Sequence, residues 1–390
     1  MHLDALRGLA ALIVVFGHAR GLFFSSLTAI DNAPHPKTDA FGPSIVSINI
    51  GNEAVMVFFA LSGYLVGGSV LRQMKQNRWE WKNYLVSRLT RLWIVLIPAI
   101  LIGAAIDYAG FAFFSHAHSI YTAPPGQDYV SDNTFPSLGN VFVYLGNFLF
   151  LQTIFVPIIG TNVPLWSLSN EFWYYLLFPM LLSTFMLKNN VLKSLFYLLL
   201  CSAILYCNNQ YSNFLFSIWL MGAAVSLLPM VIPPALASRI AMLCAVVFFI
   251  FFAGLKKLHL PLYTSDLLMG VATCLLLYCL TGHTAKCQPS LYGHVSRYLS
   301  EISYTLYLTH LPVLVFVCAL ISSPWNMHAI NAASLAKLFV ACFLAIAWAS
   351  VLYKLFESRT DALRKKLLVL LNTKKAQSTS ETTAPRTPSP

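Results

Sequence analysis

The sequence predicts an all-α integral membrane protein with about ten transmembrane helices and with both termini in the cytoplasm. Its composition indicates this class, because 57% of the 390 residues are hydrophobic and 10% are charged, whereas about a quarter of the residues in soluble domains are charged. The apolar residues form runs of about 20, the length that crosses a bilayer as a helix. The basic residues concentrate on alternate connections between these runs, which orients the chain.

The predicted spans follow the apolar runs along the chain. They are residues 3–24, 52–71, 92–113, 164–187, 191–207, 213–230, 240–256, 266–282, 299–321 and 334–356. Residues 138–160 are also apolar, but Gly146, Asn147 and Pro157 interrupt them. We therefore expect an amphipathic or re-entrant segment there rather than a further span.

The distribution of positive charge favours a topology with the N-terminus inside. In that topology the inner loops and adjoining span ends hold 19 of the 25 Lys and Arg residues, the outer side holds five, and Arg7 lies within the first span. Cytoplasmic loops carry such an excess of positive charge. We expect a transmembrane domain over residues 1–357 and a cytoplasmic tail over residues 358–390 that is basic at first and then disordered. The first run lacks the pattern of a cleavable signal peptide, so we expect it to stay as a span.

The first span carries two ionisable residues, Arg7 and His18. An ionisable side chain inside a bilayer costs a few kcal/mol or more, so it marks a candidate functional site. The two residues are eleven positions apart, which is almost three helical turns, so both project from nearly the same face about 16 Å apart along the axis. One helix face therefore presents a permanent cation at one level and a titratable imidazole at another.

A second candidate site is the pair Arg88 and Arg91 at the cytoplasmic start of the third span. Arginines three residues apart share a helix face, and guanidinium groups bind phosphate with paired hydrogen bonds. The same residues also fit an ordinary topology anchor of positive charge. The sequence leaves both interpretations open.

Two later spans carry further ionisable residues. Glu171 lies about a turn and a half inside its span, after Trp166 at the interface, and the polar Ser169 near it indicates a wet pocket. A carboxylate buried for packing is the alternative. His310 lies within the ninth span, where it fits either a proton-relay group or an interhelical hydrogen-bond donor. The His and Cys residues lack the tight spacing of a ligand set, so we expect no metal site.

Five stretches of the chain, taken in order, resemble the motifs of the membrane acyltransferase-3 family. They are residues 3–18 with Arg7 and His18 as an Arg-x10-His signature, residues 58–65, Arg88-x-x-Arg91, residues 164–172 and residues 303–312. The resemblance covers residue 3 to about residue 357. It implies an O-acyltransferase that takes an acyl group, commonly acetyl, from cytoplasmic acyl-CoA and gives it to a hydroxyl group of a cell-surface glycan, a glycolipid or a similar acceptor.

The resemblance also implies partners and a location. We expect acetyl-CoA as a donor substrate with no permanently bound cofactor, and a carbohydrate or lipid-linked carbohydrate as acceptor. The lipid bilayer is the expected surrounding, without nucleic acid as a partner, and the bacterial inner membrane is the expected location of this multi-pass protein. The sequence shows no appended SGNH-type esterase domain, so we expect the transfer reaction alone.

The residues and the resemblance together give a hypothesis for the mechanism. Arg88 and Arg91 hold the CoA phosphates, and Arg7 has a catalytic role in guiding or neutralising the donor. His18 acts as general base on the acceptor hydroxyl, because an imidazole changes its charge near neutral pH. The alternative is that His18 carries the acyl group briefly. The residues expected to bind the acceptor substrate are Glu171, Ser169, Trp166 and His310.

Two other classes of protein compete with this hypothesis. A transporter or flippase would use His18, Glu171 and His310 as a proton relay, but it is expected to show paired broken helices in its two halves. The sequence has one clear break, at Ser62-Gly63. A receptor or scaffold without catalysis leaves the ionisable residues inside the spans unexplained.

Overall fold

The computed structural model is helical in the part of the chain that it describes. The described residues are 1–24, 51–115, 119–122, 130, 134–186, 190–229, 234–258, 260–281, 290–322, 325 and 331–382. Across these ranges the chain forms helices and no β-strand, which confirms the all-α fold class. The last residues of the predicted tail, 383–390, lie outside the described residues.

Helices occupy the positions of the predicted spans. They are α1 (His2–Phe23), α3 (Gly51–Ser62) with the π-helical turn η2 (Gly63–Gly67) and α4 (Gly68–Lys75), α5 (Trp81–Phe114), α8 (Leu165–Met186), α9 (Val191–Cys207), α10 (Gln210–Val225), α11 (Pro234–Gly254), α12 (Leu262–Thr281), α13 (Leu291–Ile321) and α14 (Ala332–Leu355). Among the described residues, six helical segments are long and apolar enough to cross a membrane. These are His2–Phe23, Gly51–Lys75, Trp81–Phe114, Leu262–Thr281, Leu291–Ile321 and Ala332–Asn372. The count of about ten spans and the N-in, C-in orientation stay predictions.

Shorter elements fill the connections. They are η3 (Ile120–Thr122), α6 (Thr134–Leu138), α7 (Val141–Phe148), η4 (Leu255–Leu258) and η5 (Glu357–Arg359), and the chain continues into α15 (Thr360–Thr382). With eight residues, α7 is about 12 Å long, too short for a hydrocarbon core of about 30 Å. The α15 helix occupies much of the predicted tail, and the division between domain and tail at residue 357 stays a prediction.

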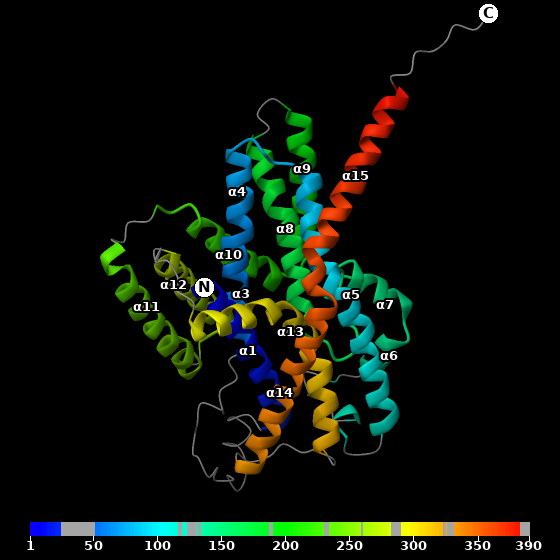
Figure 1. Ribbon diagram of the computed structural model, residues 1–390, viewed down its shortest axis with the longest axis vertical. Coiled ribbons are helices and arrows are strands. Elements are labelled where there is room, and N and C mark those ends of the chain that lie inside the picture. The colour runs from blue at the N-terminus through cyan, green and yellow to red at the C-terminus, as the bar shows by residue number, and fades with distance from the viewer. Residues whose placement is uncertain are drawn as a thin grey trace, which may run out of the picture.

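Several helix ends lie in two groups at opposite ends of the molecule (Figure 1). α1, α5 and α13 end at the lower end of the view, where α14 begins, whereas the α4–α5 connection, the end of α8 and the start of α9 lie at the upper end. α15 also extends toward the upper end, beyond the other helices. The upper group consists of segments predicted to be cytoplasmic, and the lower group consists of span ends predicted to face outward.

α1 and α13 are parallel neighbours, although they are distant in the sequence. A Cβ atom added to Gly8 would lie 2.5 Å from Leu299 Cβ, so the absence of a side chain lets the two backbones approach there. Ten residues further along α1, His18 reaches His310, which is eleven residues further along α13. Because the two helices run parallel and the two contacts are separated by nearly the same number of residues on each, two histidines 292 positions apart meet in the fold.

Two prolines inside helices leave backbone carbonyl groups without their usual partners. Pro312 in α13 has no N–H for the Leu308 carbonyl, which instead accepts a hydrogen bond from Asn162 Nδ2 at 2.9 Å. Pro179 in α8 likewise leaves the Tyr175 carbonyl, which accepts from a tyrosine hydroxyl of α5 at 2.9 Å. Side chains from other segments therefore satisfy both freed carbonyls and fix the helices relative to one another.

Buried polar groups also hold the turn before α8. Asp107 of α5 is 1% exposed and accepts hydrogen bonds from the backbone N–H and the hydroxyl of Thr161, at 2.7 and 2.8 Å. Gly160 has a φ of +57°, and a Cβ atom there would lie 2.2 Å from Asp107 Oδ2. Glycine is therefore required by both the backbone conformation and the space. This corner determines where α8 begins.

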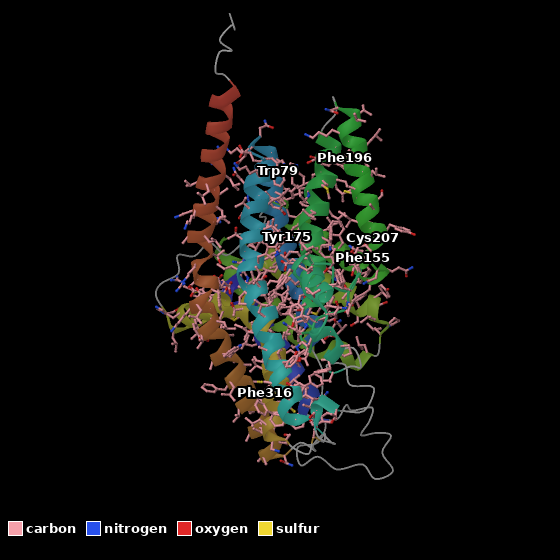
Figure 2. All side chains as sticks on the ribbon, turned by 90° about the vertical axis from the view of Figure 1, so that its right-hand side faces the viewer. Trp79, Phe155, Tyr175, Phe196, Cys207 and Phe316 are labelled. Carbon is pink, nitrogen blue, oxygen red and sulfur yellow. The ribbon has the colours of Figure 1, made fainter. Side chains whose placement is uncertain are left out.

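The outer surface of the helix bundle is apolar. Tyr175 lies within the bundle, whereas Phe196 and Cys207 lie on α9 at its margin (Figure 2). Phe196 is 55% exposed and Tyr175 is 6% exposed. Exposed apolar side chains are stable on a surface that faces lipid, because lipid tails are as apolar as the side chains themselves.

Candidate active site

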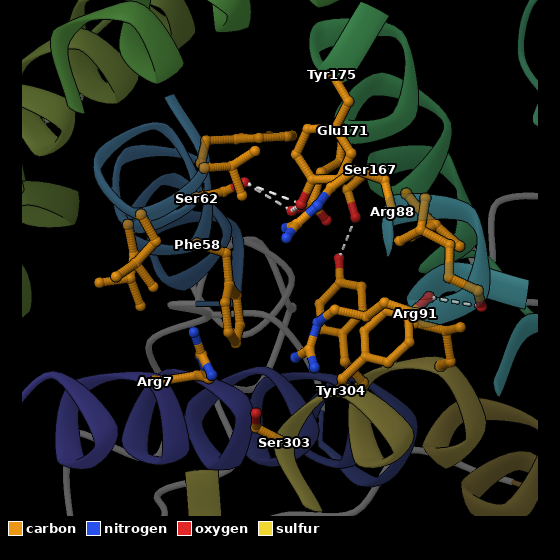
Figure 3. A pocket seen from close by; sticks show the side chains of 18 of the residues that line it. Arg7, Phe58, Ser62, Arg88, Arg91, Ser167, Glu171, Tyr175, Ser303 and Tyr304 are labelled. Carbon is orange, nitrogen blue, oxygen red and sulfur yellow. Dashed lines mark hydrogen bonds between the residues drawn. The ribbon is translucent and has the colours of Figure 1, made fainter. Parts of the chain in front are cut away.

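A cavity of about 360 Å³ lies between α1, α3, α5, α8 and α13, with the start of α15 at one side. The polar side chains that line it include Arg7, Ser62, Arg88, Arg91, Glu171 and Tyr304. Figure 3 shows these side chains approaching one another from the five helices. Arg7, Arg88, Arg91 and Glu171, which the sequence singles out at separate places, therefore belong to one site.

The arginines of the cavity differ in how they are paired. Arg91 Nη2 lies 4.0 Å from Glu357 Oε1. Arg88 instead lies over the aromatic rings of Tyr84 and Tyr175, at 6.0 and 5.9 Å from their centroids, and its buried Nε has no hydrogen-bond partner among the described residues. Neither Arg88 nor Arg7 forms an ion pair within 4 Å with a carboxylate in the described part of the chain. The cavity therefore holds positive charge that the described chain leaves unneutralised.

Glu171 is held in place by hydroxyl groups. Ser62 Oγ donates to Glu171 Oε1 at 2.7 Å, and the hydroxyl of Tyr175 donates to the same oxygen. Trp219 Nε1 in turn donates to Ser62 Oγ at 3.2 Å. Ser62 is the last residue before the π-helical turn η2, so the break expected at Ser62-Gly63 is a local change of helix type. π-helical turns of this kind often occur at functional sites.

His18 and His310 form a hydrogen-bonded pair whose tautomers follow from its partners. His310 Nδ1 lies 2.9 Å from Leu306 O and 3.0 Å from Tyr307 O. A carbonyl only accepts, so the His310 proton is on Nδ1, and His310 Nε2 accepts from His18 Nδ1 at 2.8 Å. The lone pair of His18 is therefore on its Nε2. His310 is fully buried, whereas His18 keeps part of its surface accessible.

The histidine pair is linked to the arginine-lined cavity through aromatic side chains. Tyr307 and Phe58 both line the cavity. The Tyr307 ring lies 6.2 Å from the His310 ring and 5.5 Å from the Phe58 ring, measured between centroids. The histidine pair thus lies next to the part of the cavity wall formed by Tyr307. It is about 16 Å from Arg7 along α1.

Two of the residues predicted to bind the acceptor lie away from this cavity. Ser169 is fully buried and its hydroxyl donates to Phe150 O at 2.6 Å. Trp166 packs near Phe59 and Tyr211, with centroid separations of 6.2 Å in both cases. Neither residue lines the cavity. Their roles in acceptor binding stay predictions, as does that of Glu171, which the structure places beside the arginines.

Several lining residues were not singled out from the sequence. Tyr175 follows Glu171 by one helical turn, and Tyr304 and Tyr307 lie in the late motif with His310, so their spacing was the available signal. Arg364, by contrast, comes from α15, a segment whose polar composition was assigned to a tail. Among the described residues, no group of three His, Cys, Asp or Glu side chains is placed to hold a metal ion.

The fold and the site define a multi-pass helical membrane protein that has a cationic cavity beside a histidine pair. The chain matches the family model described as an acyltransferase domain over residues 2–354. It therefore belongs to the acyltransferase-3 family and is an acyltransferase of membrane type. Searches of curated proteins and of solved structures found no match. Family membership favours the enzyme over the transporter and the receptor.

Proposed function

We propose that this acyltransferase moves an acyl group, by preference acetyl, from acyl-CoA to a hydroxyl group of a cell-surface glycan, a glycolipid or a similar acceptor. The observation that carries the proposal is the cavity in which Arg7 and Arg88 lack a carboxylate within 4 Å among the described residues. Charges removed from water are costly unless they are paired. A phosphate-bearing ligand supplies the missing negative charge, and CoA thioesters carry phosphates at the end opposite the acyl group.

In this proposal the donor lies along the cavity with its phosphates at Arg88 and Arg91. Guanidinium groups form short, charge-assisted hydrogen bonds to phosphate oxygens. The narrow pantetheine arm passes Arg7 and carries the thioester toward Tyr307. The protein lies in the bacterial inner membrane with its N-terminus inside, so the donor enters from the cytoplasm and the acceptor approaches from the outer half.

The proposed chemistry uses the lone pair on His18 Nε2. As the acceptor oxygen attacks the thioester carbonyl carbon, His18 takes the hydroxyl proton. The new C–O bond forms, the C–S bond breaks, and the CoA thiolate leaves and receives the proton. His310 is a positioning residue, because its Nε2 keeps the proton of His18 on Nδ1.

The test is transfer of label from acetyl-CoA to an acceptor extract by the purified full-length protein. His18→Ala is expected to lower turnover at least about a hundredfold while the dissociation constant for acetyl-CoA stays unchanged. His310→Leu is expected to lower kcat without raising KM for the donor, and His310→Gln restores part of kcat because its amide oxygen accepts from His18 Nδ1.

Near-normal transfer by His18→Ala would overturn the assignment of His18. Incubation with labelled acetyl-CoA in the absence of acceptor separates the two possible orders of events. Direct transfer leaves the protein unlabelled, whereas an acyl-His18 intermediate labels the wild-type chain and not the His18→Ala chain.

A further inference from the structure

The first turn of α15 forms part of the wall of the arginine-lined cavity. Thr360, Asp361 and Arg364 line it together with residues from α1, α3, α5, α8 and α13. This turn follows directly after η5, at the side of the cavity next to Arg91. A segment predicted to be a cytoplasmic tail therefore contributes side chains to the candidate donor site.

Contacts on both sides of this turn hold it against the cavity. Before it, Glu357 Oε2 accepts from the backbone N–H and the hydroxyl of Thr305 in α13, at 3.2 and 2.6 Å. Further along α15, Lys82 of α5 donates from Nζ to Leu371 O at 3.0 Å and to Asn372 Oδ1 at 2.7 Å. The helix is thus fixed to α13 at its start and to α5 about three turns later.

The charges of the cavity indicate what the turn faces. Four arginines and two carboxylates line the cavity, and Glu357 lies 4.0 Å from Arg91, which leaves a formal excess of one positive charge. Arg364 Nη2 lies 3.1 Å from Asp361 Oδ1, but the two side chains are 38% and 77% exposed. An ion pair so exposed contributes little to stability, so a phosphate group can take the place of the carboxylate at little cost.

We propose that Arg364 binds a phosphate group at the nucleotide end of the donor, so that the first turn of α15 is the cytoplasmic wall of the donor site. The inference rests on the proposed function, which supplies an acyl-CoA donor. It deepens that function by giving a structural reason for selecting CoA thioesters over shorter thioesters. A donor that lacks the nucleotide end gains nothing from Arg364.

The experiment compares three acetyl donors with the full-length protein: acetyl-CoA, acetyl-dephospho-CoA without the 3′-phosphate, and acetyl-pantetheine without the nucleotide. Arg364→Gln is expected to raise the KM for acetyl-CoA about tenfold and to leave the kinetics with acetyl-pantetheine unchanged. Lys366→Gln, which removes the same charge from an exposed position of α15 outside the cavity, is the matched control and is expected to match the wild type with all donors.

The outcomes separate this inference from the proposed function. An unchanged KM for acetyl-CoA in Arg364→Gln, or an equal rise for acetyl-CoA and acetyl-pantetheine, would overturn the role of Arg364 while wild-type transfer still supports the enzyme. A wild-type chain that uses none of the three donors overturns the proposed function itself. If the effect of Arg364→Gln is lost with acetyl-dephospho-CoA, the bound group is the 3′-phosphate; if the effect persists, the bound group is the diphosphate. Either result supports the inference.

Discussion

Buried charge is treated differently in two regions of this molecule. At the turn before α8, Asp107 is 1% exposed and receives two hydrogen bonds from Thr161. In the arginine-lined cavity, Arg7 and Arg88 have no carboxylate within 4 Å in the described part of the chain. A buried polar group satisfied by the chain stabilises the fold, whereas a charge left unpaired is costly. The first region therefore serves the structure, and the second supports the proposal that the cavity binds a ligand.

Among the variants that test this comparison of the two regions, the largest effect is expected from removing a cavity charge. Arg88→Gln should weaken acetyl-CoA binding by about tenfold to a hundredfold, because each charge-assisted hydrogen bond to phosphate contributes about 1.5–3 kcal/mol. The melting temperature of the ligand-free protein should not fall. Equilibrium binding of labelled acetyl-CoA and thermal unfolding in the same detergent measure the two quantities.

Arg78→Gln removes the same charge from an exposed position between α4 and α5 that lies outside the cavity. It should bind acetyl-CoA as the wild type does. If Arg88→Gln lost stability and kept its affinity for the donor, Arg88 would belong with Asp107 as a structural group.

At Asp107 we expect a loss of stability without a loss of donor affinity. Asp107→Ala leaves the N–H and hydroxyl of Thr161 without their acceptor, which should lower the free energy of unfolding by about 1–3 kcal/mol with donor affinity retained in the folded fraction. Asp107→Asn keeps one acceptor oxygen and should lose less. Chemical unfolding monitored by tryptophan fluorescence gives the free energies. A loss of donor affinity at unchanged stability would contradict the structural role of Asp107.

The smallest effect is expected at the carbonyl freed by Pro312. Asn162→Ala removes the donor to Leu308 O, and the free energy of unfolding should fall by about 1 kcal/mol. Pro312→Ala restores a backbone N–H for that carbonyl, so the double variant should show a smaller cost of Asn162→Ala than the wild-type background does. A double-mutant cycle measures this coupling, and strict additivity would show that the side chain does not replace the missing backbone bond.

The sequence predicted which residues are ionisable inside spans, but it did not predict which of them meet. Burial cost marked Arg7, His18 and Glu171, because that cost depends on a residue and its own helix. The contact of His18 with His310 depends on the parallel register of α1 and α13, which is set by the close approach at Gly8. No periodicity within either helix contains that information.

Two residues show which features of the structure a sequence pattern does not predict. Ser169 was predicted to contact the acceptor from its polarity, and that role stays a prediction. Its hydroxyl donates to Phe150 O, a backbone partner that only tertiary structure reveals. Arg364 was missed because the basic, polar composition of its segment is typical of a solvated tail. Its place in the cavity wall depends on the bonds that Glu357 and Lys82 make to other helices.

The parallel pairing of α1 with α13 has a consequence for the synthesis of the protein. His18 emerges from the ribosome 292 residues before His310, and at about 5–20 residues per second this interval is about 15 s to a minute. During that time α1 is in the membrane with an imidazole and a guanidinium whose final neighbours do not yet exist. The pair that would activate an acceptor hydroxyl in the proposed mechanism is completed only when α13 has been inserted. Nascent chains that stop earlier therefore lack the histidine pair that the proposed mechanism uses.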